Sequence, residues 1–375
     1  MAGVLTVPSR IALLGCALLC ACATLADAGR GDVDLPNVFS GPFRTLKRAR
    51  RCYDDPTTGQ QFCVGVDELP EGTQNGIAKY PGLPPSRSPS ALVRGPLHVI
   101  LFVGRGKEGS ATDRIARLES KDARKFDDVV DVLPLDRPDE GASIGDPWAL
   151  DVDGKVTLYY SSPTGGIFRA RARDGLVGSS FDKDGPIALE GAASPLETEP
   201  ARAPSVMLFG GRYRLFYASG AHLFEAESTD GLRFRRLGVA LAPSASVDPA
   251  TLPEGVRPPF DDASVDDPCV DRILTPAGRV LVRLLYTGRD KSGGSSIGYA
   301  GRFGDEGAFE KRAGFVYGGK LPGGLTKNSH ANAPAVARFD DFALLYANQD
   351  TGESIQRLGV AISPQTISLP YPESP

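Results

Sequence analysis

A proline-led strand pattern recurs five times along the chain and limits the folds that it can adopt. Each copy opens with a dipeptide ending in proline, followed by an apolar strand, a turn, a second apolar strand and a third strand of alternating polarity. Short runs of β-forming residues between Asp-Gly and Gly-Gly turns are typical of antiparallel meanders. Successive copies are 57 to 66 residues apart, and their dipeptides are Ser88-Pro89, Asp146-Pro147, Ala203-Pro204, Asp267-Pro268 and Ala333-Pro334.

A single meander of this size cannot bury both of its faces, so it needs copies of itself beside it. We therefore predict an all-β fold, a five-bladed β-propeller over residues 88–368. Proline suits the first residue of each innermost strand, where its missing N–H breaks no ladder bond. The 44 glycines and 31 prolines among 375 residues fit a turn-dense chain of this kind. A β-sandwich with coincidental turn spacing is the alternative.

The first 28 residues are expected to be a signal peptide. Arg10 is the only charged residue before an apolar segment, Ile11 to Leu25, and Ala26-Asp27-Ala28 resembles a small-x-small cleavage site. The tetrapeptide Leu19-Cys20-Ala21-Cys22 also resembles a lipoprotein signal ending at about residue 21, with Cys22 as the lipid anchor. Both alternatives place the mature protein outside the cytoplasm, either secreted or periplasmic.

Residues 29–87 are expected to form a lead-in segment. Cys52 and Cys63 flank a turn-rich loop, and in an oxidising compartment two such cysteines are expected to form a disulfide. The remaining mature cysteine, Cys269, lies in an apolar strand and is expected to be buried and unpaired. The last blade has a short outer strand, which the segment from Gln61 to Val66 is expected to complete.

The net charge and the histidine content limit the classes of ligand that this chain is expected to bind. The formal net charge is −4, so no nucleic acid partner is implied. Only three histidines are present, which argues against a multi-histidine metal site. We expect no metal and no cofactor. We also expect a monomer that touches a membrane only through the lipid anchor, where that alternative holds.

Propeller geometry predicts where a site would lie. The innermost strands of all blades run in the same direction, so their first residues converge at one mouth of the central channel. Carboxylates held together there repel each other, so one can carry a proton while another stays ionised. Glycoside cleavage needs such a pair, one as proton donor and one as base or nucleophile. The expected mouth residues are Arg87, Ser88, Gly145, Asp146, Arg202, Ala203, Asp266, Asp267 and Asn332, with His330 nearby. Period-two alternation places Trp148 on the same strand face as Asp146, as a candidate sugar contact; a place in the core is the alternative.

At the level of motifs, residues 88–363 resemble the five-bladed propellers of glycoside hydrolase families 43 and 32 and their arabinanase, levansucrase and invertase relatives. The run GDPWALDVDGKVTLYY resembles the Asp-Pro blade of family 43, and NSHANAPAV resembles its histidine-bearing last blade. The resemblance implies catalytic roles for Asp146 and Asp267 and places His330 in the channel. It also implies a carbohydrate substrate and a glutamate as general acid.

The chain departs from the family at two of its catalytic positions. Ser88 stands where the family has its base aspartate, and Arg202 stands where its acid glutamate is expected. Glu199, just upstream, is the candidate replacement for that acid. Two functions follow: an exported glycoside hydrolase-like protein, or a catalytically degenerate propeller that binds a glycan or another extracytoplasmic partner. A phosphorylase in which Arg87 and Arg202 hold phosphate is a third alternative.

Overall fold

The computed structural model describes fifteen parts of the chain, and all of them lie in the second of its two compact units, Ser40–Pro375; the first is Met1–Phe39. The described residues are 44–45, 51–54, 61–64, 87–95, 97–106, 112–123, 126, 128–164, 166–252, 259–274, 278–311, 315–317, 330–339, 342–350 and 356–364. The signal peptide and the lipid-anchor alternative therefore lie outside the described residues. Within the described part, the only helical elements are the short 3-10 turns η3 (Pro138–Glu140) and η4 (Pro249–Thr251).

The described strands of the repeat region form five antiparallel sheets, one for each proline-led copy. In chain order their strands are β4 (Arg87–Gly95), β5 (His98–Gly106), β6 (Thr112–Ser120) and β7 (Asp128–Pro134); β8 (Gly145–Val152), β9 (Lys155–Ser162), β10 (Gly166–Ala172) and β11 (Phe181–Pro186); β13 (Arg202–Phe209), β14 (Arg212–Ser219), β15 (His222–Ser228) and β16 (Arg233–Leu241), with β12 (Ala188–Glu190) added parallel at the edge; β17 (Ser264–Leu274), β18 (Val280–Arg289), β19 (Ser295–Phe303) and β20 (Glu310–Lys311); and β21 (His330–Arg338), β22 (Phe342–Asp350) and β23 (Gln356–Pro364).

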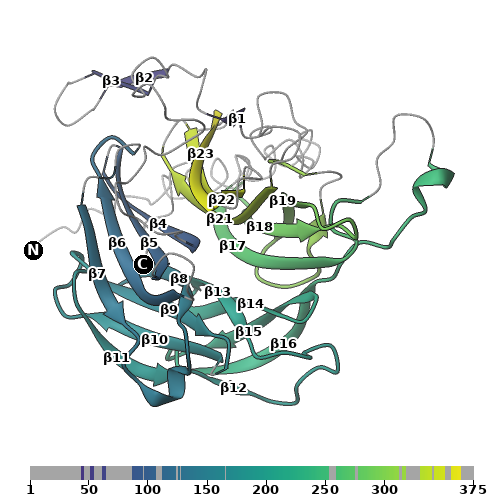
Figure 1. Cartoon of the computed structure of the whole chain (residues 1–375), viewed down its shortest axis with the longest axis horizontal. Helices are drawn as coiled ribbons and strands as arrows, with labels where there is room; N and C mark the ends of the chain where they lie inside the picture. The colour runs from purple at the N-terminus through teal and green to yellow at the C-terminus, as the bar shows by residue number, and fades with distance from the viewer. Residues whose placement is uncertain are drawn as a thin grey trace, which may run out of the picture. The chain divides into compact units, whose positions relative to one another are not determined.

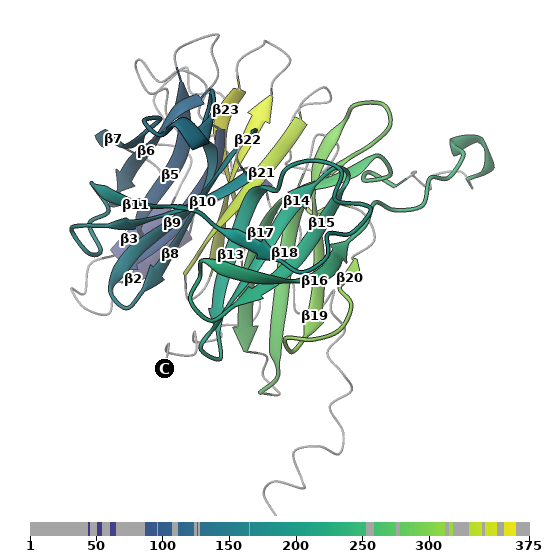
Figure 2. The ribbon, with the colours of Figure 1, turned by 90° about the horizontal axis from the view of Figure 1, so that it is seen from below.

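The first strands of the five sheets form a closed ring. In turn, β4 contacts β8, β8 contacts β13, β13 contacts β17, β17 contacts β21, and β21 returns to β4. In Figure 1 the outer strands β7, β11 and β16 lie toward the rim of this ring. Figure 2, seen from below, shows β13 and β17 side by side. The all-β propeller arrangement predicted from the repeats is confirmed.

The core is distributed between neighbouring sheets rather than collected in one place. Ile100 and Phe102 on β5 pack in one cluster with Leu158 and Tyr160 on β9, and similar clusters fill the spaces between other neighbouring sheets. Each sheet is therefore apolar on both faces of its middle strands, as the continuous apolar runs in the sequence indicate.

The lead-in contributes strands in a different way from the prediction. The outer partner of β23 is β1 (Arg44–Thr45), not the segment from Gln61 to Val66. Residues 61–64 instead form β3 (Gln61–Val64), which pairs with β2 (Arg51–Asp54) in a separate hairpin. A lead-in strand, β1, thus still covers the exposed edge of the last sheet.

Backbone pairing in this hairpin places Cys52 directly opposite Cys63. Directly opposed residues of an antiparallel pair have Cα atoms about 4.5–5.5 Å apart, within the range that a disulfide spans. The disulfide stays a prediction. Mass spectrometry of the exported protein without reduction should find one bridged peptide pair, and two alkylated thiols at these positions would contradict it.

A buried triad of acid, tyrosine and cation occurs in two sheets, and a third sheet brings the same three kinds of residue together. In the second sheet, Tyr160 Oη donates to Glu140 Oε1 at 2.6 Å, and Lys183 Nζ lies 2.8 Å from the same oxygen. Asp261, Tyr286 and Lys311 form the equivalent triad of the fourth sheet. In the third sheet Glu197 pairs with Arg236 near Tyr217, whose hydroxyl has no hydrogen-bond partner among the described residues. In each case the acid lies in the connection before the sheet and the cation lies on an outer strand, so the triad ties that connection to its sheet.

Tyr160→Phe is expected to lower the free energy of unfolding by about 1–3 kcal/mol, because the fully buried Glu140 loses a hydrogen-bond donor. Tyr213→Phe is the matched control, since Tyr213 is only half-buried and its hydroxyl has no hydrogen-bond partner among the described residues. Urea unfolding of both variants measures the difference. Equal losses in the two variants would show that the triad adds no stability.

Candidate functional site

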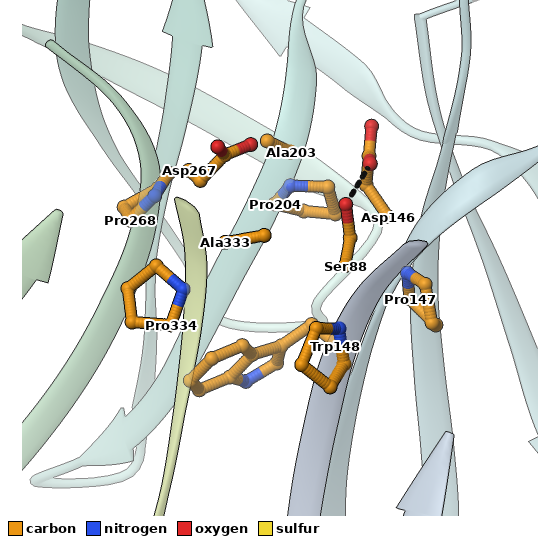
Figure 3. Close-up of a pocket in the computed structure, with 11 residues that line it drawn as sticks. Ser88, Asp146, Pro147, Trp148, Ala203, Pro204, Asp267, Pro268, Ala333 and Pro334 are labelled. Carbon is orange, nitrogen blue, oxygen red and sulfur yellow. Dashed lines mark hydrogen bonds between the residues drawn. The ribbon is translucent and has the colours of Figure 1, made fainter. Parts of the chain in front are cut away.

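All five X-Pro dipeptides meet in one pocket at the centre of the ring. Among the described residues, they and Trp148 form its lining, around a space of about 260 Å³ that includes the open mouth. These residues belong to β4, β8, β13, β17 and β21, and Figure 3 shows their side chains gathered around the pocket. The pocket is therefore built from one equivalent position in each sheet, and its chemistry depends on the residue that precedes each proline.

A β-bulge sits at each of these positions. The register of the first strand shifts across every X-Pro pair, between Gly145 and Trp148 in the second sheet for example. The residue before each proline has φ between 45° and 50°. This is a left-handed backbone conformation that residues other than glycine rarely adopt. Such strain costs on the order of 1–3 kcal/mol per residue and concentrates at functional sites. Here the bulges accompany five side chains that line the pocket.

Asp146 is held by two hydroxyl groups from different sheets. Ser88 Oγ donates to its Oδ1 at 2.5 Å, and Ser161 Oγ donates to its Oδ2 at 2.6 Å (Figure 3 shows the first contact). Ser88 precedes the proline of the first sheet, and the structure brings its hydroxyl onto the carboxylate of the second sheet. Both oxygens of Asp146 are thus fixed in orientation at the pocket.

Asp267 is the second carboxylate of the pocket, and its surroundings favour the protonated form. Burial, followed by the negative charges of Asp266 and Asp146, raises the pKa of Asp267 to about 7. Arg289 and the hydrogen bond from Thr287 act in the opposite direction and are outweighed. The pocket therefore contains a group that can donate a proton near neutral pH without any glutamate.

The printed contacts of the Arg202 guanidinium go to groups other than Asp146 and Asp267. Its Nη1 donates to Asp266 Oδ1, its Nη2 donates to the carbonyl oxygen of Gly220 at 3.3 Å, and its Nε lies 3.7 Å from Glu199 Oε2. Asp266 also accepts the backbone N–H of Asp267 at 2.8 Å. The ion pair with Arg202 lets Asp266 remain nearly buried beside Asp267.

Glu199 is placed apart from the pocket lining. Its side chain is 57% exposed, and Arg202 stands between it and Asp266. Its backbone N–H and carbonyl are both bound to the hydroxyl of Ser219, at 3.2 and 2.5 Å. The structure therefore brings Asp146 and Asp267 together but leaves the candidate acid Glu199 outside the group that lines the pocket.

Trp148 belongs both to the pocket lining and to the core. The indole lines the pocket, as Figure 3 shows, and it also packs against the apolar clusters on both sides of β13. Its Nε1 donates to the carbonyl oxygen of Val206 at 2.6 Å. These contacts fix the indole in place, so that it presents a rigid apolar surface to the pocket.

The last sheet places His330 and Asn332 beside the pocket rather than among its lining residues. Nδ1 of His330 accepts the backbone N–H of Ser295 at 3.1 Å, and Oδ1 of Asn332 accepts from Asn348 Nδ2 at 3.1 Å. The part of the chain that the structure describes contains no cluster of three or more His, Cys, Asp or Glu side chains suited to a metal ion. Nor does that part contain a helix long and apolar enough to span a membrane.

Two site residues were missed by reasoning from the sequence. Ser161 and Thr287 lie on the second strands, opposite the bulges, and each donates to the carboxylate of its own sheet. A hydroxyl residue just after the apolar run of the second strand was the available signal. It could have been found by aligning the second strands of the five repeats with one another.

No protein-family model and no curated protein sequence matches this chain. Solved structures of glycoside hydrolases do share its fold. A proposed glycoside hydrolase from Bacteroides ovatus has a TM-score of 0.59 at 14% identity, covering 89% of this chain and 100% of its own. A thermostable family-43 glycoside hydrolase has a TM-score of 0.54 at 14% identity, covering 79% and 98%. The GH62 α-L-arabinofuranosidase domain of Coprinopsis cinerea has a TM-score of 0.55 at 10% identity, covering 78% and 95%.

Proposed function

We propose that this chain is a glycoside hydrolase that cleaves a glycan in the central pocket, with Asp267 as the general acid and Asp146 as the second carboxylate. The observation that carries the proposal is the pairing of these two aspartates in one pocket, with the pKa of Asp267 raised to about 7. The fold shared with known glycoside hydrolases adds support, although a fold alone fixes no reaction.

In the proposed reaction, Asp267 gives its proton to the glycosidic oxygen as the bond from that oxygen to the anomeric carbon breaks. The bonding electron pair stays with the leaving oxygen, and the anomeric carbon gains the positive character of an oxocarbenium ion. Asp146 then either takes a proton from the attacking water or attacks the carbon itself. In the second route water, deprotonated by Asp267, later attacks the anomeric carbon, and the bond from that carbon to Asp146 breaks. The anomer of the first-formed product distinguishes these two routes, because only direct attack retains configuration.

The remaining lining suits a sugar ring. Trp148 and the five proline rings provide apolar surface, and the hydroxyl of Ser88 provides a polar edge. Pockets that bind small molecules are commonly lined in this way, with few polar groups among apolar ones. Arg202 is occupied by Asp266, which favours hydrolysis over a phosphorylase reaction that would need its charge to hold phosphate.

Binding without cleavage is the second candidate function. It is favoured by the position of Glu199, which lies outside the pocket lining. It is also favoured because three of the five equivalent positions carry no carboxylate, namely Ser88, Ala203 and Ala333. In that case the pocket would still hold a glycan, with Asp146 and Asp267 accepting hydrogen bonds from its hydroxyls.

One experiment separates the two candidates. Purified protein is screened against aryl-furanosides, aryl-pyranosides and polysaccharides, and every glycan is also tested for binding by calorimetry. Hydrolysis that disappears in Asp146→Asn supports the enzyme, and binding without product supports the second candidate. Asp182→Asn is the control, because this exposed aspartate lies on the outer strand β11 and, among the described residues, forms an ion pair with Arg173 alone.

The proposal includes export. The apolar segment near the start of the chain and the opposed cysteines of the β2–β3 hairpin both fit a protein that matures in an oxidising compartment. Either a cleaved signal or a lipid on Cys22 would deliver the pocket to extracytoplasmic glycans. N-terminal sequencing of the mature protein distinguishes the two.

A further inference from the structure

The five sheets can be compared position by position, because each pairs its first strand with its second in the same register around the bulge. The residue just before each X-Pro dipeptide is paired with one residue of the second strand. These partners, in chain order, are Gly104, Ser161, Ala218, Thr287 and Asn348. A hydroxyl side chain occurs in the second and fourth sheets, and these are the sheets that carry aspartate before proline.

The contacts at Thr287 give this coincidence a physical meaning. Thr287 Oγ1 accepts the backbone N–H of Ala333 at 2.9 Å, and it also lies 2.9 Å from Asp267 Oδ2. A hydroxyl has one proton to donate. Because Oγ1 already accepts from Ala333, its proton is directed at Oδ2. The backbone of the neighbouring sheet thereby sets the direction of this hydrogen bond.

The two oxygens of Asp267 are thus made unequal. Oδ2 is the acceptor for Thr287, while Oδ1 has no hydrogen-bond partner among the described residues. When the carboxyl is protonated, Oδ2 is occupied as an acceptor, so the proton belongs on Oδ1. Figure 3 shows this carboxyl at the pocket, beside the other X-Pro positions.

We propose that Thr287 is a positioning residue that fixes the carboxyl of Asp267 so that Oδ1 carries the proton delivered to the substrate. The catalytic part of this inference rests on the proposed function. The contact itself, and its effect on the titration of Asp267, do not require hydrolysis. Ser161 holds Asp146 from the equivalent position in the second sheet, where the carboxylate serves as the partner of the acid.

Other charges around Asp267 are fixed independently of Thr287. Asp266 on β17 and Asp146 on β8 are negative, Arg289 on β18 is positive, and Arg202 on β13 is bound to Asp266. On β21, the imidazole Nδ1 of His330 is bound to the backbone of Ser295. Removing the Thr287 hydroxyl changes none of these groups, but it removes a hydrogen bond that favours the charged form. The pKa of Asp267 should therefore rise further.

The test compares Thr287→Val with Thr287→Ser, in protein carrying ¹³C-labelled aspartate carboxyls. Asp267→Asn assigns the Asp267 resonance, and each variant is titrated without substrate. We expect Thr287→Val to raise the pKa of Asp267 by about one unit, and Thr287→Ser to titrate like the wild type. Thr157→Val is the control. This buried threonine lies on β9, in a different sheet, and its hydroxyl forms no hydrogen bond with another described residue.

Kinetics on a substrate found in the screen provides the second readout. Thr287→Val should lower kcat by about tenfold with little change in KM, and should move the alkaline limb of the pH profile upward by the same amount as the titration. Thr287→Ser should restore both. An unchanged titration in Thr287→Val, or a serine variant that behaves like valine, would overturn the inference. A shifted titration in a protein that cleaves no glycan would instead reject the proposed function and keep the contact.

Discussion

Asp267→Asn is expected to reduce glycoside hydrolysis by about 10²–10⁴-fold, the usual contribution of a general acid. Asparagine has nearly the same shape as a protonated aspartic acid and can still accept the hydrogen bond from Thr287 through its oxygen. It cannot release a proton to the leaving oxygen. The loss should therefore appear in kcat, while KM changes little.

Steady-state kinetics at the pH optimum measures this loss, with Asp182→Asn as the matched exposed control. Asp146→Asn should cause a comparable loss, since each of the two carboxyls performs a different half of the reaction. Retention of full activity in Asp267→Asn on a substrate whose leaving group needs protonation would remove this residue from the mechanism. Glu199 would then be the remaining candidate for the general acid.

Asp267→Asn should also make the folded protein more stable than the wild type above neutral pH. The folded state binds the Asp267 proton up to about pH 7, whereas an unfolded aspartate releases it near pH 4. Between these values the native state holds more protons than the unfolded state, so the free energy of unfolding falls as pH rises. The loss is on the order of 4 kcal/mol, and it is complete above about pH 7.

Urea unfolding of the wild type and Asp267→Asn from pH 4 to pH 9 tests this expectation. The difference between the two curves should grow in favour of the variant from pH 4 to pH 7 and then stay constant. Parallel curves would show that Asp267 titrates in the folded protein as it does in the unfolded chain. A variant that gains stability while losing activity is the usual sign of a strained functional group.

The sequence was sufficient for the parts of the structure that depend on local chemistry. Each proline removes a donor and fixes φ, so its position at a strand start could be read directly. Repetition of that signal was enough to predict sheets around a common axis and a mouth containing Asp146 and Asp267. These predictions need no knowledge of long-range contacts beyond the repeat itself.

Features that depend on register could not be predicted. Period-two alternation places Asp146 and Trp148 on one face, but the bulge between Gly145 and Trp148 breaks that alternation. The partner of Arg202 was likewise open, because the choice between Asp146, Asp266 and Asp267 depends on the geometry of adjoining sheets. The outer partner of β23 was predicted wrongly for the same reason, since β1 has only two residues, Arg44 and Thr45, and gives no strand pattern in the sequence.

The most direct test of the central claim is the rate of hydrolysis of two glycosides by wild type and Asp267→Asn, one with a nitrophenyl leaving group and one with an alkyl leaving group. A nitrophenolate departs without protonation, whereas an alkoxide needs the proton of a general acid. The account predicts that Asp267→Asn loses at least about 10²-fold more activity on the alkyl glycoside than on the nitrophenyl glycoside. Equal losses on both substrates would contradict the assignment of Asp267 as the proton donor of this pocket.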